Sequence, residues 1–283
     1  MSNLPNRTRT STSIPWRLLR EGRVHLLPVY ALMRTSDLAR EGIDNSGSFR
    51  FADHVYRNEP SGRLLVGRLL DGLLLRMRGA RSMRNRYLHA RREIVAAVRC
   101  HVAERAPLRI LSVPCGIARE LVEAAAVLRA EGPALLAGCT FVGLDLDPEP
   151  LELSRRLTGD DPRFRFVRGD ALHAGAYLYH GELDVIVSTG LGEFLDDGDL
   201  ARFYAVCHGA LRPGGILVTS GMQPDRVADY LLRELAELHA RYRDADALRR
   251  HLAGAGFVSV DARPDDVGLQ TLVVARKGAE REA

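Results

Sequence analysis

Apolar residues in the first third of the chain recur at intervals of three and four residues, the spacing that gathers side chains on one face of a helix. The pattern repeats within residues 86–102, and Asn-, Gly-, Ser- and Pro-rich loop signals stand at 45–48 and 58–62. We therefore predict several helices and no strand between Trp16 and about Arg105. The clearest apolar run comprises Leu64, Leu65, Leu69, Leu70, Leu73 and Leu74.

From Leu108 onward the period changes. Short runs that are almost continuously apolar alternate with helical stretches, as expected for strands covered on both faces of a parallel sheet. Two final strands, at 257–260 and 269–275, leave no room for a helix between them and should pair antiparallel at a sheet edge. The pattern predicts a doubly wound α/β fold. The other predicted strands are 109–113, 140–144, 163–167, 183–188 and 215–220, and the predicted helices are 119–129, 149–156, 200–211 and 227–240.

This change of pattern divides the chain into three predicted regions. Residues 1–106 form a helical cap or lid, residues 107–277 form the α/β domain, and residues 278–283 form a polar tail. If the helices lie over the carboxyl ends of the strands, 51–57 is the segment most suited to line a site, because it mixes aromatic and polar residues.

Composition excludes several classes of protein. With 283 residues, 46% hydrophobic and 27% charged, the chain is neither disordered nor fibrous. Its apolar runs fall far short of the ~18 residues of a membrane span, and residues 1–13 lack the apolar core of a secretory signal. We expect a cytoplasmic protein with no membrane partner and no metal. The four cysteines, which show neither paired nor C-x-x-C spacing, are Cys100, Cys115, Cys139 and Cys207.

Charge is distributed unevenly. Residues 1–106 contain 20 Arg and 9 acidic residues, a net charge of +11, whereas the remainder carries −7. Lys277 is the single lysine, so the arginines are better explained by codon bias in a GC-rich genome than by phosphate binding. This interpretation weakens the case for a nucleic-acid partner. A cap placed over the site would nevertheless favour an anionic small-molecule substrate.

Polar and small residues gather where three predicted strands end, the position at which open parallel sheets bind ligands. After the first strand, the turn at Pro114, Cys115 and Gly116 leads into a helix whose N-terminus can face an anion. Asp145 ends the second strand and could accept both hydroxyls of a ribose. Asp170 and Ala171 follow the third strand. Each aspartate alone is more often a helix cap or turn residue, but their joint order points to a nucleoside site.

The sequence resembles the class I S-adenosylmethionine (SAM)-dependent methyltransferases of the small-molecule type, over roughly residues 108–276. The resemblance implies a seven-stranded sheet of order 3-2-1-4-5-7-6 with strand 7 antiparallel. It departs from the family where Ser112 replaces an acidic residue, and where Pro114 and Ala118 replace glycines. The matching segments are 110–116, 142–145, 167–171, 184–188, 192–197 and 211–217.

The resemblance also implies roles for single residues. The turn of Pro114, Cys115 and Gly116 would pass along the methionine portion of SAM. Asp145, followed by Leu146, would hold the ribose hydroxyls, and Asp170 the adenine amine, with Ala171 beside the ring. Where the family's usual acidic residue is missing, Arg119 could bind the carboxylate of SAM instead, although an arginine in the first turn of a helix is more often a solvated surface residue. Ser188 and Thr189 would line the site near the sulfonium.

Methyl transfer needs no nucleophile from the protein, because the sulfonium already activates the methyl group. Tyr177 and Tyr179 are the catalytic candidates, since aromatic rings attract a sulfonium through cation–π contact; ordinary core packing explains them equally well. No catalytic role is assigned to the potential general bases, which are His54, His173, His180 and Glu193.

Three functions are compatible with this pattern. The first is methylation of a small molecule with release of S-adenosylhomocysteine (SAH), favoured because residues 188–191 lack the Asn/Asp-Pro-Pro-Tyr segment of enzymes that methylate amines of bases. The second is cyclisation of SAM to azetidine-2-carboxylate, or transfer of its aminocarboxypropyl arm, with release of methylthioadenosine. The third, an RNA methyltransferase or a silent partner, lacks a recognisable RNA-binding module. A homodimer is left open.

Overall fold

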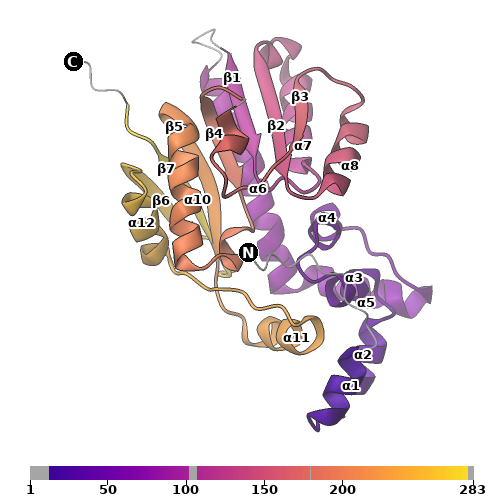
Figure 1. The fold of residues 1–283 in the computed structure, drawn as a ribbon. Coiled ribbons are helices and arrows are strands. Elements are labelled where there is room, and N and C mark those ends of the chain that lie inside the picture. The colour runs from indigo at the N-terminus through magenta and orange to yellow at the C-terminus, as the bar shows by residue number, and fades with distance from the viewer. Residues whose placement is uncertain (1–12, 102–106, 179, 280–283) are drawn as a thin grey trace. The chain divides into compact units, whose positions relative to one another are not determined.

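The computed structural model describes residues 13–101, 107–178 and 180–279. The chain packs as two compact units, which are described separately. A helical unit comprises Met1–Arg84 and Pro224–Ala240, and a sheet unit comprises Asn85–Gln223 and Arg241–Ala283 (Figure 1). The chain therefore enters the helical unit twice.

The sheet unit contains one seven-stranded sheet of order β3-β2-β1-β4-β5-β7-β6. Strands β1 to β5 run parallel, β7 is antiparallel to β5, and β6 is antiparallel to β7 at the edge. Both the strand order and the antiparallel terminal pair were predicted and are confirmed. The strands are β1 (Leu108–Ser112), β2 (Cys139–Asp145), β3 (Phe164–Arg168), β4 (Leu183–Ser188), β5 (Leu211–Met222), β6 (Ser259–Pro264) and β7 (Gln270–Arg276).

Alternate residues of the central strands enter different cores. Ile110, Phe141 and Val185 pack with helices α6 (Arg78–His101), α7 (Arg119–Glu131) and α8 (Pro148–Thr158), whereas Leu111 and Ile186, also buried, point to the other face. Every residue of β4 is buried, which explains why the strand is mostly apolar, with Asp184 and Ser188 as its polar residues. The remaining helices of this unit are α9 (Gly175–Leu178), α10 (Asp197–Ala210), α12 (Ala245–Gly254) and the 3₁₀ helices η2 (Pro133–Leu136) and η3 (Gly192–Phe194).

The helical unit has apolar clusters of its own. Ile14, Leu18, Leu26 and Ile43 pack with Leu235, which comes from the second passage of the chain. The predicted helix at 227–240 ends earlier, at Ala236. The helices of this unit are α1 (Ser13–Arg20), α2 (Leu26–Met33), α3 (Asp37–Asp44), α4 (Phe49–Arg57), α5 (Leu64–Arg76) and α11 (Arg226–Ala236).

The division by packing differs from the boundary predicted near residue 106. Helix α6 begins in the helical unit, but its later residues, among them Ala90, Ile94 and Val98, belong to the core of the sheet unit. The role of the N-terminal helices as a cap or lid stays a prediction. In the described part of the chain, no helix is both long and apolar enough to cross a bilayer.

Candidate functional site

The strand ends singled out in the sequence lie together at the carboxyl ends of the parallel strands. In the parallel register, Ser112 of β1 stands beside Gly143 of β2 and Val187 of β4, and Asp145 of β2 stands beside Arg168 of β3. The loops that follow β1, β2, β3 and β4 therefore leave the sheet from the same side, where open α/β sheets bind ligands.

Backbone hydrogen bonds hold the loop after β1 against both neighbouring strands. The Val113 N–H donates to the Val187 carbonyl at 2.8 Å, and the Cys115 N–H donates to the Leu144 carbonyl at 2.9 Å. Gly116 has φ +50°, in the left-handed region that favours glycine, and its N–H donates to Asp145 Oδ2 at 2.8 Å. These hydrogen bonds fix the predicted turn at the carboxyl end of β1, where Pro114 is partly exposed.

Close packing beneath this loop explains a glycine in the middle of β2. A Cβ on Gly143 would lie 2.7 Å from the Phe166 ring and 3.0 Å from Cys115 Sγ. The Cys115 side chain is therefore part of the packing, and burial raises the pKa of its thiol, with the charges of Asp145 and Glu120 adding to the effect. The thiol of Cys115 is therefore kept in its protonated, unreactive form.

Asp145 is positioned by the loops on both sides of it. Its Oδ2 accepts the Gly116 N–H and its Oδ1 accepts the Asp147 N–H at 3.0 Å. Burial raises the pKa of the carboxyl group, and these backbone hydrogen bonds partly oppose the rise. Each oxygen has further acceptor capacity, so a diol can still be bound. Leu146, the next residue, is exposed beside it.

The turn after β3 is also well ordered. Asp170 Oδ1 accepts the Leu172 N–H at 2.9 Å, and the Tyr177 hydroxyl donates to the Ala171 carbonyl at 2.9 Å. Tyr177 is only 2% exposed, and burial raises the pKa of its phenol. The predicted catalytic role of Tyr177 is not supported by this placement, because both ring and hydroxyl are engaged inside the protein. Tyr179 lies outside the described residues.

The loop after β4 carries Ser188 and Thr189. Ser188 is buried, and its Oγ has no hydrogen-bond partner among the described residues, whereas Thr189 is half-buried. Behind this loop, Arg86 donates to Glu193 Oε1 at 2.7 Å, and both side chains are buried. Glu193, named above as a potential base, is therefore held in an ion pair. Gly190 in this loop has φ +99°, in the region that favours glycine, and a Cβ there would also lie 2.8 Å from the Arg86 guanidinium.

One carboxylate at the site was not singled out in the sequence. Glu120, in the first turn of α7, accepts a hydrogen bond from Ser112 Oγ at 2.5 Å and is 8% exposed. Burial raises its pKa from 4.5 to about 7. Ser112 stands where the family that the sequence resembles has an acidic residue. The signal available in the sequence was an acidic residue eight positions later, at the start of the predicted helix. Arg119 stands beside it, half-buried.

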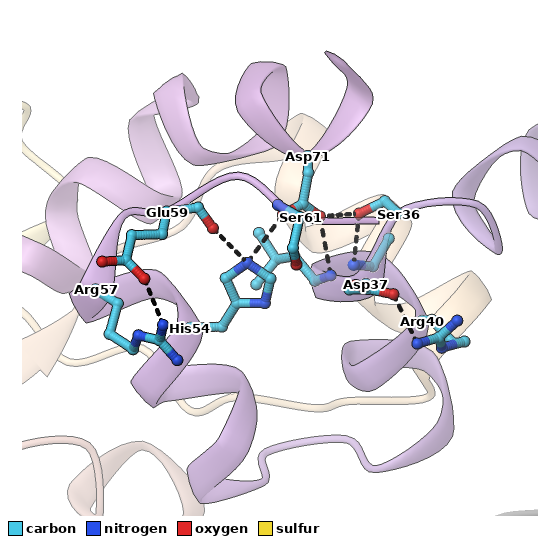
Figure 2. A network of polar contacts seen from close by, with 10 residues as sticks. Ser36, Asp37, Arg40, His54, Arg57, Glu59, Ser61 and Asp71 are labelled. Carbon is cyan, nitrogen blue, oxygen red and sulfur yellow. Dashed lines mark hydrogen bonds and ion pairs between the residues drawn. The ribbon is translucent and has the colours of Figure 1, made fainter. Parts of the chain in front are cut away.

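The histidines named as potential bases have other surroundings. His54 belongs to a network in the helical unit that Figure 2 shows, where its Nε2 donates to Asp71 Oδ2 at 2.9 Å and to the Glu59 carbonyl at 3.1 Å. The hydrogen bond to Asp71 is the main reason why the pKa of His54 is raised. Burial lowers the pKa of His180, and His173 is exposed. These contacts account for His54 structurally, and no catalytic role is assigned to it.

The residues at the strand edge fit a nucleoside with a flexible polar arm. A positive-φ glycine allows close approach, Asp145 and Asp170 keep acceptor capacity, and the buried Ser188 hydroxyl faces no protein partner among the described residues. Within the described part of the chain, no group of three or more His, Cys, Asp or Glu side chains could hold a metal ion.

This strand order, with its antiparallel seventh strand and its carboxylates after the second and third strands, defines the fold of class I SAM-dependent methyltransferases. The model of the family described as "Putative methyltransferase" matches residues 7–277, and the chain belongs to that family. The protein is an enzyme with the SAM-dependent methyltransferase fold.

The chain is similar to three other proteins in sequence or in structure. It is 28% identical to "Uncharacterized protein YnbC" of Escherichia coli (strain K12), over 92% of this chain and 47% of YnbC, so it spans about half the length of that relative. A crystal structure described as a possible exported protein from Bordetella parapertussis has a TM-score of 0.74 at 22% identity, covering 96% of this chain and 98% of that one. Human N-acetylserotonin methyltransferase in complex with SAM has a TM-score of 0.52 at 16% identity, covering 88% and 72%. At these identities the two structures support the fold.

Proposed function

We propose that this protein transfers the methyl group of SAM to a small-molecule acceptor and releases SAH. The observation that carries the proposal is Asp145, whose two oxygens are fixed by the Gly116 and Asp147 N–H groups at the carboxyl end of β2 and retain acceptor capacity. A carboxylate held in this way suits the two hydroxyls of a ribose. Membership of the methyltransferase family supports the same interpretation.

The neighbouring residues take the other parts of the co-substrate. Asp170 accepts the exocyclic amine of adenine through the oxygen that the Leu172 N–H leaves open, and Ala171 and Leu146 lie against the base. The turn of Pro114, Cys115 and Gly116 follows the methionine arm. Ser188 and Thr189 line the side nearest the sulfonium, where the Ser188 hydroxyl still needs a partner.

The amino-acid end of SAM is handled by residues that differ from the usual family pattern. Glu120, which accepts a hydrogen bond from Ser112, supplies the carboxylate that position 112 lacks. Because burial raises the pKa of Glu120, a positively charged ammonium group beside it would favour the ionised form of this carboxyl group. Arg119, the preceding residue, suits the carboxylate of the same arm.

SAM supplies a methyl group that its positively charged sulfur already activates. The chain's own residues therefore have to bind the nucleoside, orient the acceptor and exclude water. The loops after β1, β2 and β3, which are held by hydrogen bonds, bind the nucleoside. The acceptor is a small molecule, and the +11 charge of residues 1–106 favours an anionic one if these helices form the predicted lid. A cytoplasmic location remains part of this proposal.

The test is titration calorimetry of the purified chain with SAH, followed by product analysis after incubation with SAM and metabolite extracts. Asp145→Ala should weaken SAH binding by about tenfold or more, since it removes the acceptors of two hydroxyls. Asp246→Ala, which removes an exposed carboxylate on α12, is the matched control and should bind SAH normally. Absence of SAH binding by the unaltered chain contradicts the proposal, and methylthioadenosine formed from SAM alone would reveal a different reaction.

A further inference from the structure

Helix α5 carries a row of large apolar side chains that are exposed. Leu64, Leu65, Val66, Leu69 and Leu73 are between 57% and 89% exposed. An apolar face of a helix is normally buried against the rest of the protein. The packing of the helical unit does not explain why the outer side of α5 carries apolar side chains.

The rotation of α5 about its axis is set by contacts inside the helical unit. Gly67, Asp71 and Leu75, spaced four residues apart, form its buried face. A Cβ on Gly67 would lie 2.1 Å from the Thr35 carbonyl oxygen, so the α5 backbone lies directly against the segment before α3. Leu69 and Leu73 must then face away from the interior of this unit.

Polar contacts reinforce this rotation, as Figure 2 shows. Asp71 Oδ1 accepts hydrogen bonds from Ser36 Oγ at 2.5 Å and from the Leu38 N–H at 2.9 Å. Its Oδ2 accepts the Ser61 N–H at 2.9 Å and the Nε2–H of His54 at 2.9 Å. A buried carboxylate with four donors cannot turn outward without losing them all, so the opposite face stays outside.

The charged residues along this stretch of the chain are mostly of one sign. Residues 63–81 contain five arginines and one acidic residue, Asp71, which is the buried residue just described. The arginines, all exposed, are Arg63, Arg68, Arg76, Arg78 and Arg81. The outer surface of α5 and of the start of α6 thus combines leucines with a local excess of positive charge.

We propose that the outer face of α5 binds the surface of an anionic membrane, with Leu65, Leu69 and Leu73 at the boundary of the head groups and acyl chains. Interfacial helices have this composition, with leucines on one side and arginines beside them that meet lipid phosphates. A second copy fits less well, because a twofold contact through this face would bring like charges together. The inference does not depend on methyl transfer.

This proposal departs from the prediction that the protein has no membrane partner. That prediction rested on the lack of an apolar run long enough to span a bilayer, which concerns insertion and not binding at the surface. The exposed face of α5 is not visible in the sequence, where its leucines predict an ordinary buried helix.

The test is co-sedimentation of the full chain with vesicles of phosphatidylcholine alone, and with vesicles in which about a quarter of the lipid is phosphatidylglycerol. We expect binding to the anionic vesicles that weakens when salt is raised well above about 0.1 M. Leu69→Asp should reduce the partition coefficient at least about tenfold, since it removes apolar area and adds a repelled charge. Val258→Asp, at a valine 71% exposed in the sheet unit, is the matched control and should bind as the unaltered chain does.

Circular dichroism verifies that each variant is folded, and Leu69→Gln replaces the aspartate variant if that one is not. Lack of binding by the unaltered chain, or equal binding by Leu69→Asp and the unaltered chain, overturns the proposal. So does a dimer, seen by light scattering, that Leu69→Asp dissociates while vesicle binding is unchanged, because the face would then be covered by a second copy.

Discussion

Two buried carboxylates in this protein show how strongly the partners of a residue decide its chemistry. Burial alone would raise the pKa of Asp71, but hydrogen bonds from His54, Ser36 and two backbone N–H groups lower it overall. Glu120 has Ser112 as its side-chain donor, and burial raises its pKa to about 7. The same chemical group is thus held ionised at one position and partly protonated near neutral pH at the other.

Glu120 should make the stability of the protein depend on pH. The native state keeps a proton that the unfolded state releases between about pH 4.5 and 7, so the free energy of unfolding falls as pH rises through this window. The full cost above pH 7 is about 3 kcal/mol. Glu120→Gln should therefore stabilise the protein at pH 8 and show little of this gain near pH 4.5, as measured by urea unfolding.

The matched control for this prediction is Glu152→Gln, which neutralises an exposed glutamate on α8. It should change stability little at either pH, because exposed ion pairs contribute about 0–1 kcal/mol. An equal gain from Glu120→Gln at both pH values would show that packing, and not ionisation, is responsible.

At the scale of elements, burial decided which segments were recognisable in the sequence. Strands β1, β2 and β4 were predicted because packing on both faces makes most of their residues apolar. Helix α12 was missed, since Leu248 and Leu252 are its buried residues and a single pair four residues apart is a weak periodic signal. The apolar spacing of α5 correctly indicated a helix but could not reveal that one face is exposed.

The contact of the β1 loop with β2 and β3 predicts the effect of a small substitution. Gly143→Ala places a methyl group 2.7 Å from the Phe166 ring and 3.0 Å from Cys115 Sγ. We expect a loss of about 1–3 kcal/mol of stability from overpacking, together with weaker SAH binding as the loop shifts. Thermal unfolding and calorimetry measure the two effects.

Gly132→Ala is the matched control, because a Cβ at Gly132 meets no atom within 4 Å and its φ of 169° suits any residue. It should unfold at the same temperature as the unaltered chain or slightly higher. If Gly143→Ala behaves in the same way, the close packing beneath the loop is not a constraint.

At the scale of the whole molecule, the path of the chain ties the two units together. The chain leaves the helical unit near Arg84, forms five strands, and returns to it as α11 before completing the sheet. Leu235 of α11 is buried with Ile14, Leu18 and Leu26. The helical unit is therefore built from segments on both sides of the first five strands.

This path predicts how deletions behave. Removing residues 1–84 alone should cause aggregation, because Leu235 loses the apolar residues that cover it. Removing residues 224–240 as well, with a short glycine-serine linker in their place, should restore a soluble sheet unit. Size-exclusion chromatography with light scattering compares the two variants. A monomeric, folded product of the first deletion would mean that α11 does not need the N-terminal helices.

The sequence by itself determined the fold class, the strand order implied by its family resemblance, and the strand-end positions of Asp145 and Asp170, because periodicity and short motifs are local properties of a chain. Only the tertiary structure decided the pairing of Ser112 with Glu120, the burial of Tyr177, the ion pair of Arg86 with Glu193, and the face of α5 that is left outside. The burial of Tyr177, the Arg86–Glu193 pair and the exposed face of α5 depend on which distant segments pack together. The contact of Ser112 with Glu120 depends on how the turn between them folds. The spacing of residues along the chain determines neither.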